Sequence, residues 1–190
     1  MIFPNLKKCL KSIIMKDTKL SNISYASRTG DIEAVYSFLE RGINVDFKDK
    51  YGFTPLYEAV SENHFDIVKI LTDYNADTDI LYEEGNDEYN VLHLAVSNKD
   101  ISAKIVELLV KKVTNINQKD RPHGNTALWY ACYSGYPNNY KIAELLLQNG
   151  AKIDTKNIYG KTVLDMANQR DDIPEFKKML EKYQNKYDDI

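Results

Sequence analysis

The chain has 190 residues and a formal net charge of −3 at pH 7, with 43% hydrophobic and 28% charged residues. This composition is typical of a soluble folded protein, and the length fits one elongated domain. The near-neutral charge gives no reason to expect a nucleic acid as partner. Two cysteines provide neither a disulfide framework nor a metal-ligand spacing, so we expect a reducing, cytoplasmic location without metal or cofactor.

The first segment of the chain has apolar residues at helical spacing. Leu6, Leu10, Ile13 and Ile14 stand at i, i+4, i+7 and i+8. The apolar block is too short for a signal peptide or a membrane span. We expect residues 1–19 to form an N-terminal capping helix rather than a membrane contact. A basic amphipathic helix on a membrane surface is the alternative, and liposome binding with and without this segment would test it.

A short sequence pattern then recurs every 36 residues. Its copies begin at positions 54, 90, 126 and 162 and read TPLYEA, NVLHLA, TALWYA and TVLDMA. Self-similarity at a fixed short period indicates a stack of similar units. Thr54 is a good N-cap residue and Pro55 suits the first helical position, so each copy is expected to begin a helix. The alanine that ends each copy leaves room for a second helix to pack closely.

A second apolar helix follows each of the first three copies. Ile67–Leu71, Ile105–Leu109 and Ile142–Leu147 share apolar residues at i, i+1, i+3 and i+4, which is the pattern of a buried helical stripe. Gly42 and Gly150 stand where a left-handed helix cap is expected. Asn75 can adopt the same conformation, whereas the β-branched Val113 would be strained in it.

An earlier and more divergent unit is also present. Residues 25–35 (YASRTGDIEAV) align with residues 58–68 (EAVSENHFDIV) at an offset of 33 residues. This unit lacks the threonine-proline start, as is common for a terminal capping repeat.

The recurring segments resemble the T-P-L-H-x-A signature of ankyrin repeats, whose period is about 33 residues. The resemblance covers residues 20–180, and it implies an all-α solenoid of about five helix-turn-helix units with β-hairpin finger loops and helical caps. The expected units span residues 20–50, 51–86, 87–122, 123–158 and 159–180. Residues 181–190 are expected to form a frayed C-terminal tail.

Catalytic motifs are not apparent in the sequence. His64, His93 and His123 occupy different positions within their repeats, so stacking does not bring them together. By resemblance, His93 forms hydrogen bonds between neighbouring units. We find no glycine-rich phosphate loop, nucleophile elbow or Cys–His pair, so we expect a non-catalytic protein. A catalytic role would require a pocket with convergent polar groups.

The resemblance also implies where a partner binds. In ankyrin-like stacks, the fingers and the exposed face of each first helix form a concave surface. The variable positions before and after each motif map to Tyr51, Phe53, Glu62, Asp87, Tyr89, Asn98, His123, Asn125, Tyr133, Tyr159, Lys161 and Arg170. The set is rich in aromatic residues, which are enriched at interface hot spots. The alternative is that some of these rings brace one finger against the next.

An acidic stretch adjoins this set. No Lys or Arg occurs between Lys69 and Lys99, and the interval carries Asp73, Asp77, Asp79, Glu83, Glu84, Asp87 and Glu88. It coincides with a lengthened finger at residues 81–89. One interpretation is a solvated loop. The other is an electrostatic lure for a basic protein, with Glu83, Glu84 and Glu88 added to the partner-binding set.

Two functions fit these features. The first is a protein–protein interaction module that is monomeric when free and acts as an immunity protein neutralising a basic toxin. This hypothesis rests on a resemblance to small stand-alone bacterial ankyrin proteins that accompany toxins. The alternative is a pathogen or viral effector that binds a host protein through the same surface.

Overall fold

The computed structural model describes residues 22–121, 123–136 and 138–188. The expected capping helix at residues 1–19 lies outside the described residues. The elements in chain order are α2 (Ile23–Thr29), α3 (Ile32–Glu40), α4 (Pro55–Ser61), α5 (Phe65–Asp73), β1 (Tyr82–Glu84), β2 (Asp87–Tyr89), α6 (Val91–Ser97), α7 (Ala103–Val110), α8 (Ala127–Ser134), α9 (Asn139–Gln148), α10 (Val163–Ala167) and α11 (Pro174–Asp188).

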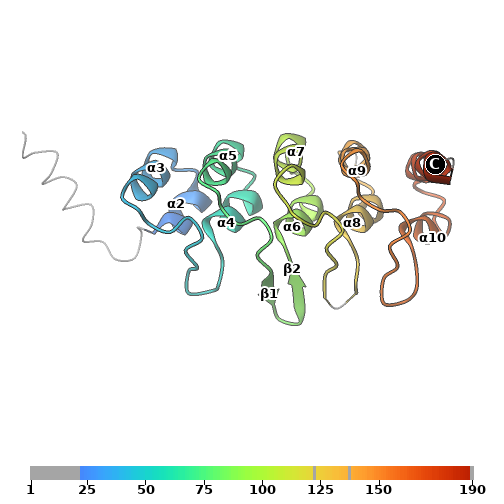
Figure 1. Cartoon of the computed structure of the whole chain (residues 1–190), viewed down its shortest axis with the longest axis horizontal. Helices are drawn as coiled ribbons and strands as arrows, with labels where there is room; N and C mark the ends of the chain where they lie inside the picture. Colours follow the sequence, from blue (N-terminus) through green and yellow to red (C-terminus); the bar gives the residue numbers. More distant parts are fainter. Residues whose placement is uncertain (1–21, 122, 137, 189–190) are drawn as a thin grey trace, which may run out of the picture.

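The helices form pairs that stack side by side in one row (Figure 1). An inner layer, α2, α4, α6, α8 and α10, lies nearer the finger loops, and the other helix of each pair forms an outer layer. Consecutive helices of each layer contact one another. The predicted all-α repeat solenoid is therefore confirmed, and a single two-stranded sheet is seen among the described residues.

Local sequence explains where the inner helices begin. The side chain of Thr54 accepts a hydrogen bond from the backbone of Tyr57 (3.2 Å), and Pro55 occupies the first turn. Thr162 forms a reciprocal capping box with Asp165. Asn90 is the N-cap of α6, where its side chain accepts hydrogen bonds from two backbone N–H groups. Each cap satisfies donors that the first helical turn leaves unpaired.

The ends of the outer helices follow the predicted caps. Gly42 and Gly150 have φ of +77° and +91°, and Asn75 has φ of +59°. By contrast, α7 ends at Lys111 in the right-handed region, without a left-handed cap. The β-branched Val113 is consistent with that ending.

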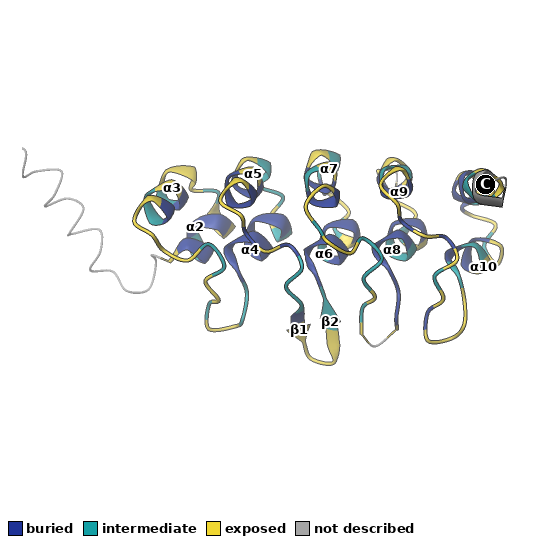
Figure 2. Cartoon of the chain, viewed as in Figure 1, coloured by how far each residue is buried: buried dark blue, intermediate teal, exposed yellow. Residues whose placement is uncertain are grey.

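Small residues let the two layers approach. Ala59, Ala95, Ala131 and Ala167 are fully buried in the inner helices. Leucine and isoleucine side chains from both layers pack around them, and the buried residues form a continuous stripe between the layers (Figure 2). Each unit therefore completes its core only against its neighbours.

The last helix is longer than expected. Helix α11 extends to Asp188, past residue 180, after which we expected a frayed tail. Leu180 is fully buried and Tyr183 packs against the core, so the next turn remains anchored. The sequence after Pro174 contains no glycine or proline that would end the helix.

Candidate protein-binding surface

We name the finger loops by their residues. Finger 1 comprises residues 44–53, finger 2 residues 77–89, finger 3 residues 114–121 and 123–125, and finger 4 residues 152–161. Neighbouring fingers are joined by a repeated contact: Asp46 accepts from the backbone of Asp77, Asp79 from Thr114, and Asn117 from Lys152. These bonds hold the fingers at one edge of the stack.

Finger 2 is the lengthened acidic finger, and it is a β-hairpin. Its strands pair in the register Tyr82↔Tyr89, Glu83↔Glu88 and Glu84↔Asp87. Because side chains alternate across a strand, Glu84, Asp87 and Tyr89 share one face, while Glu83 and Glu88 share the other. The two faces of this finger therefore present different carboxylates.

Backbone hydrogen bonds tie finger 2 to finger 3 and finger 3 to finger 4. Glu88 and Arg121 exchange both backbone bonds (3.0 and 2.9 Å), and their side chains form an ion pair of 2.6 Å. The N–H of Ile158 donates to the carbonyl of His123 at 3.0 Å. These hydrogen bonds fix fingers 2, 3 and 4 relative to one another.

Much of the acidic run is used within the fold. Asp73 pairs with Lys69 (2.7 Å), Asp79 caps the Thr114 amide, and Glu88 pairs with Arg121. Within the described ranges, Glu83, Glu84 and Asp87 form no ion pair. Of the seven carboxylates between Lys69 and Lys99, these three therefore leave uncompensated negative charge near the fingertip.

Tyrosine side chains brace fingers 1 and 2 against the inner helices. The hydroxyl oxygens of Tyr57 and Tyr89 lie 3.1 Å apart, and Tyr89 donates to Glu84 Oε2 at 2.5 Å. Phe53 stacks on Tyr57 with ring centroids 4.1 Å apart, and Tyr82 lies 4.8 Å from Tyr57. Phe53 and Tyr89, two of the predicted partner-binding residues, are both half-buried. Burial holds the pKa of Tyr89 above its usual range, so its hydroxyl stays a donor.

A hollow of about 290 Å³ lies between α6 and α8 beneath fingers 2 and 3. It is lined by Glu84, Asp87, Tyr89, His93, Leu94, Ser97, Asp120, Arg121, His123 and Tyr130. Sequence reasoning identified Asp87, Tyr89 and His123, and added Glu84 from the acidic run. It missed Asp120 and Tyr130, although Tyr130 occupies the fifth motif position in its inner helix, where it is half-buried.

Opposing walls of the hollow carry the same pairing of tyrosine and carboxylate. Tyr89 donates to Glu84, and Tyr130 donates to Asp120 through a short hydrogen bond. Asp120 also accepts from the backbone of Asn125 at 2.6 Å. Burial and the neighbouring Asp120 raise the pKa of Tyr130 to about 12, so this hydroxyl also remains protonated at neutral pH.

His93 links two units from the floor of the hollow. It is 3% exposed, with Nδ1 at 2.8 Å from Asn90 Oδ1 and Nε2 at 3.3 Å from the carbonyl of Asn125. The role expected for this histidine, a bond between neighbouring units, agrees with these contacts. Burial lowers its pKa below the ordinary value of 6.5, while the Asn125 carbonyl and Asp120 act in the opposite direction.

His93 is therefore expected to make folding pH-dependent. Below its ordinary pKa the unfolded chain takes up a proton that the folded chain resists, so stability is present at neutral pH and declines as pH falls. The unfolding free energy should decrease from about pH 7 to about pH 5.5, and His93→Gln should show a smaller decrease. Urea titrations at about pH 7 and about pH 5.5 measure the unfolding free energy of each protein. An equal decrease in unfolding free energy between about pH 7 and about pH 5.5 for wild type and His93→Gln would contradict this assignment.

The other predicted residues divide by exposure. Tyr51 and Tyr159 are each 65% exposed on fingers 1 and 4, and Glu62 and Lys161 are also exposed. Tyr159 lies beside His123, with ring centroids 6.3 Å apart. These positions are accessible to a partner.

Asn98 and Asn125 instead join units. The amide of Asn98 donates to the carbonyl of Ser61 at 3.0 Å. Asn125 is buried and accepts from the Asn157 side chain at 3.1 Å. Their side chains therefore hold neighbouring repeats together.

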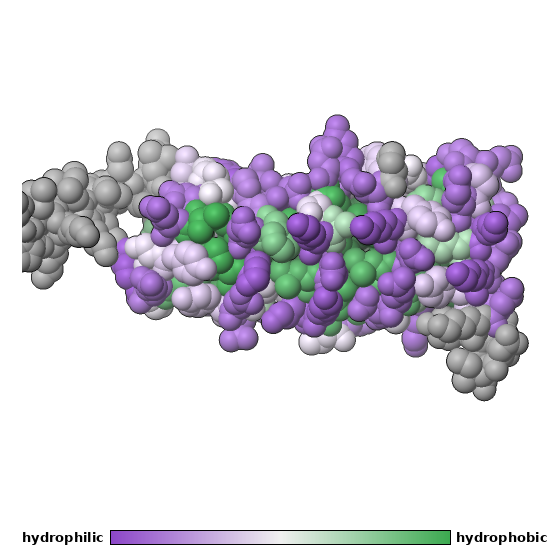
Figure 3. Space-filling view, turned by 90° about the horizontal axis from the view of Figure 1, so that it is seen from above, coloured by the Kyte–Doolittle hydropathy of each residue, from purple (hydrophilic) through white to green (hydrophobic). Residues whose placement is uncertain are grey.

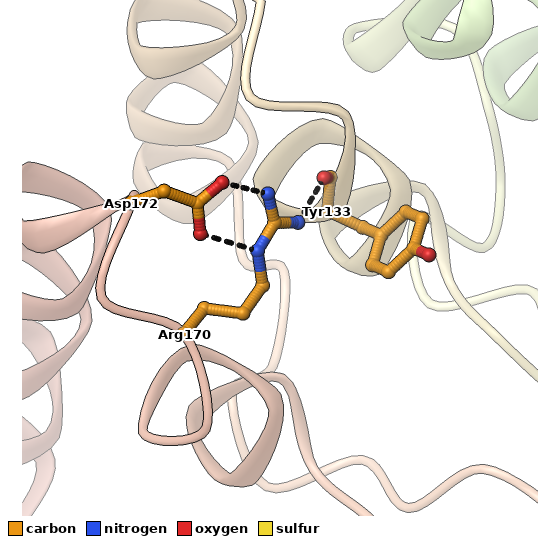
Figure 4. A network of polar contacts seen from close by, with 3 residues as sticks. All are labelled: Tyr133, Arg170 and Asp172. Atoms are coloured by element: carbon orange, nitrogen blue, oxygen red, sulfur yellow. Dashed lines mark hydrogen bonds and ion pairs between the residues drawn. The ribbon is translucent and has the colours of Figure 1, made fainter.

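Tyr133 and Arg170 contact each other (Figure 4). Arg170 donates two hydrogen bonds to Asp172, at 2.9 and 2.6 Å, and a third to the backbone carbonyl of Tyr133. Its guanidinium lies 5.2 Å from the centre of the Tyr133 ring and holds the pKa of Asp172 below its usual range. This network links α8 to the turn after α10, and Asp172 was not predicted to take part.

Two further features of the surface differ from the hollow. A larger cavity of about 540 Å³ near the end of α11 is lined by Gly150, Lys152, Ile153, Asp154, Thr162, Leu164 and Gln184, which carry no excess charge. The face made by the outer helices presents many polar side chains with apolar ones between them (Figure 3).

Among residues 22–188, leaving aside 122 and 137, no helix is long and apolar enough to cross a membrane. In the same residues, no group of three or more His, Cys, Asp or Glu side chains could hold a metal ion.

The family model for ankyrin repeats (three copies) matches residues 3–82 and 76–157. The chain belongs to the ankyrin repeat family. The resemblance noted in the sequence is therefore confirmed, and ankyrin repeats are protein–protein interaction modules.

Several relatives share this ankyrin repeat region. A mimivirus protein (Acanthamoeba polyphaga mimivirus) named for its ankyrin repeats is 39% identical over 109 residues, which span 56% of this chain and 13% of that protein. A fowlpox virus ankyrin repeat protein is 31% identical over 137 residues, 72% of this chain and 17% of its own length. The phosphocholine transferase AnkX of Legionella pneumophila is 29% identical over 176 residues, 88% of this chain and 18% of that enzyme. The chain spans less than a fifth of each of these relatives.

Proposed function

We propose that this ankyrin repeat chain binds a protein partner through its fingers and inner helices, without catalysing a reaction. The observation that carries the proposal is the hollow beneath fingers 2 and 3, where carboxylates and tyrosines of several elements converge. Exposed Tyr51 and Tyr159 extend the same surface to fingers 1 and 4. Tyrosine supplies contact area at a low cost in conformational entropy.

The proposed partner presents a basic surface. Glu83, Glu84 and Asp87 lie near one fingertip without an ion pair in the described part of the chain. Charges of this kind accelerate association with a basic protein more than they tighten the final complex. We propose a chain that is monomeric when free, acts in the cytoplasm and contacts neither membrane nor nucleic acid.

Two biological roles suit this mode of binding. The first is an immunity protein that occupies a basic toxin. The alternative, a pathogen or viral effector that binds a host protein, is favoured by relatives from two viruses and from Legionella pneumophila. The identity of the captured partner separates the roles, because one is a toxic enzyme silenced by binding and the other is a host protein.

Affinity capture with charge variants tests the surface. Glu83→Gln, Glu84→Gln and Asp87→Asn together remove three negative charges from finger 2. Glu33→Gln, Glu40→Gln and Asp66→Asn remove the same charge from exposed positions of α3 and α5 in the outer layer. We expect a basic protein to bind wild type and the outer-layer variant, and to associate with the finger variant about tenfold more slowly at low salt.

Salt supplies an internal check on this experiment. The difference between wild type and the finger variant should shrink at high ionic strength, since exposed charges are screened within about 3 Å at 1 M salt. Equal capture and equal association rates for all three proteins would remove finger 2 from the binding surface.

A further inference from the structure

We propose that the hollow between α6 and α8 accepts one arginine side chain of the partner. This assignment rests on the proposed protein-binding function and specifies what the partner must present. Small-molecule sites usually measure about 300–1,000 Å³. The hollow, at about 290 Å³, is slightly smaller than that range and suits a single long side chain.

The charges of the lining match a cation. Glu84 and Asp87 approach from finger 2, and Asp120 approaches from finger 3. Arg121 also lines the hollow, but its guanidinium is committed to the 2.6 Å ion pair with Glu88. Three carboxylates against one already paired guanidinium leave a negative site. A second guanidinium would gain charge-assisted hydrogen bonds there.

Two of the carboxylates are held in place before binding. Tyr89 fixes Glu84, and Tyr130 and the Asn125 amide fix Asp120. Each carboxylate oxygen retains a free lone pair, because an ionised carboxylate offers about four acceptor positions. The backbone bridge between Glu88 and Arg121 fixes the spacing of the two fingers. Little ordering is therefore left to be done when the partner arrives.

The aromatic lining favours arginine over lysine. Tyr89 and Tyr130 line the hollow. The guanidinium group is planar, stacks on aromatic faces and is more weakly hydrated than an ammonium group. Its five donors in a fixed fork can also reach carboxylates on two walls at once. A lysine ammonium group is a compact charge that lacks both the planar surface and the fixed donor geometry of a guanidinium group.

The test uses short peptides as probes. Acetylated and amidated Gly-Ser-X-Ser-Gly peptides, with X as arginine, lysine or citrulline, are titrated into the full chain, and backbone amide shifts are followed by NMR. We expect the arginine peptide to shift the amides of Tyr89, His93 and Tyr130 in a saturable manner. The lysine peptide should bind several-fold more weakly, and the uncharged citrulline peptide should produce no saturable shift.

Variants of finger 2 provide the matched control. Asp87→Asn removes a carboxylate that faces the hollow and should weaken the arginine peptide about tenfold, the loss expected for one hydrogen bond to a charged group. Glu83→Gln makes the same change in charge on the opposite face of the hairpin and should alter binding less than twofold. Equal binding of the arginine and citrulline peptides, or equal effects of the two substitutions, would overturn the proposal.

The two proposals fail in different ways. If the finger variant loses its protein partner while the arginine peptide never shifts the hollow, protein binding through the finger stands and the arginine site is wrong. If the peptide binds the hollow while capture is identical for every charge variant, the hollow can bind an arginine side chain, but the proposed partner surface and its use of this site are both wrong.

Discussion

Leu92→Ala is expected to lower the free energy of unfolding by about 2–5 kcal/mol, the range for removing a fully buried leucine side chain. Leu92 is 1% exposed in α6, and α6 contacts α4, α7 and α8. A repeat in the middle of the stack shares interfaces with both neighbours, so a cavity there weakens two junctions. Urea denaturation followed by circular dichroism would measure the loss.

Leu164→Ala is the matched control for this substitution. Leu164 occupies the same motif position in the last unit, where it is only half-buried. Its truncation removes less contact and leaves a smaller cavity, so the cost should be clearly lower than for Leu92. A loss for Leu164→Ala equal to that for Leu92→Ala would show that the central interfaces are not the more critical ones.

Gly124→Ala is expected to be the most damaging change in the fingers. Gly124 has φ of +68°, a conformation that costs other residues about 1–2 kcal/mol. A Cβ atom there would also lie 3.1 Å from Ile158 Cγ2 and 3.2 Å from the Ile158 backbone nitrogen. Since the backbone of finger 4 would have to move, overpacking adds about 1–3 kcal/mol.

Gly160→Ala separates these two effects. Gly160 has φ of +69°, but a Cβ atom there would meet no heavy atom within 4 Å. In urea denaturation, the Gly160→Ala variant should lose only the unfolding free energy that the left-handed conformation costs an alanine. Gly124→Ala should in addition speed amide exchange at Ile158, whose N–H bonds to His123. Equal destabilisation by the two substitutions would mean that finger 4 yields to the new methyl group without cost.

The sequence alone determined the repeat architecture because its signals are local. Thr54 and Pro55 start a helix through contacts within one turn, and Gly42 ends one through its own backbone freedom. The 36-residue recurrence then required stacking, since no single unit can bury its apolar stripe. The length of α11 was underestimated because its last turns are held by the contact of Tyr183 with the core, which a local pattern does not reveal.

The tertiary structure decided which residues are left for a partner. Adjacent acidic residues look alike in a sequence, yet strand alternation places Glu84 toward the hollow and Glu83 away from it. Glu88 found its partner, Arg121, 33 positions further along the chain, and Tyr133 found Arg170 across a unit boundary. Such pairings depend on how one repeat sits on the next. The repeating motifs therefore determine the fold through local interactions. The contacts between repeats determine which side chains remain exposed for binding.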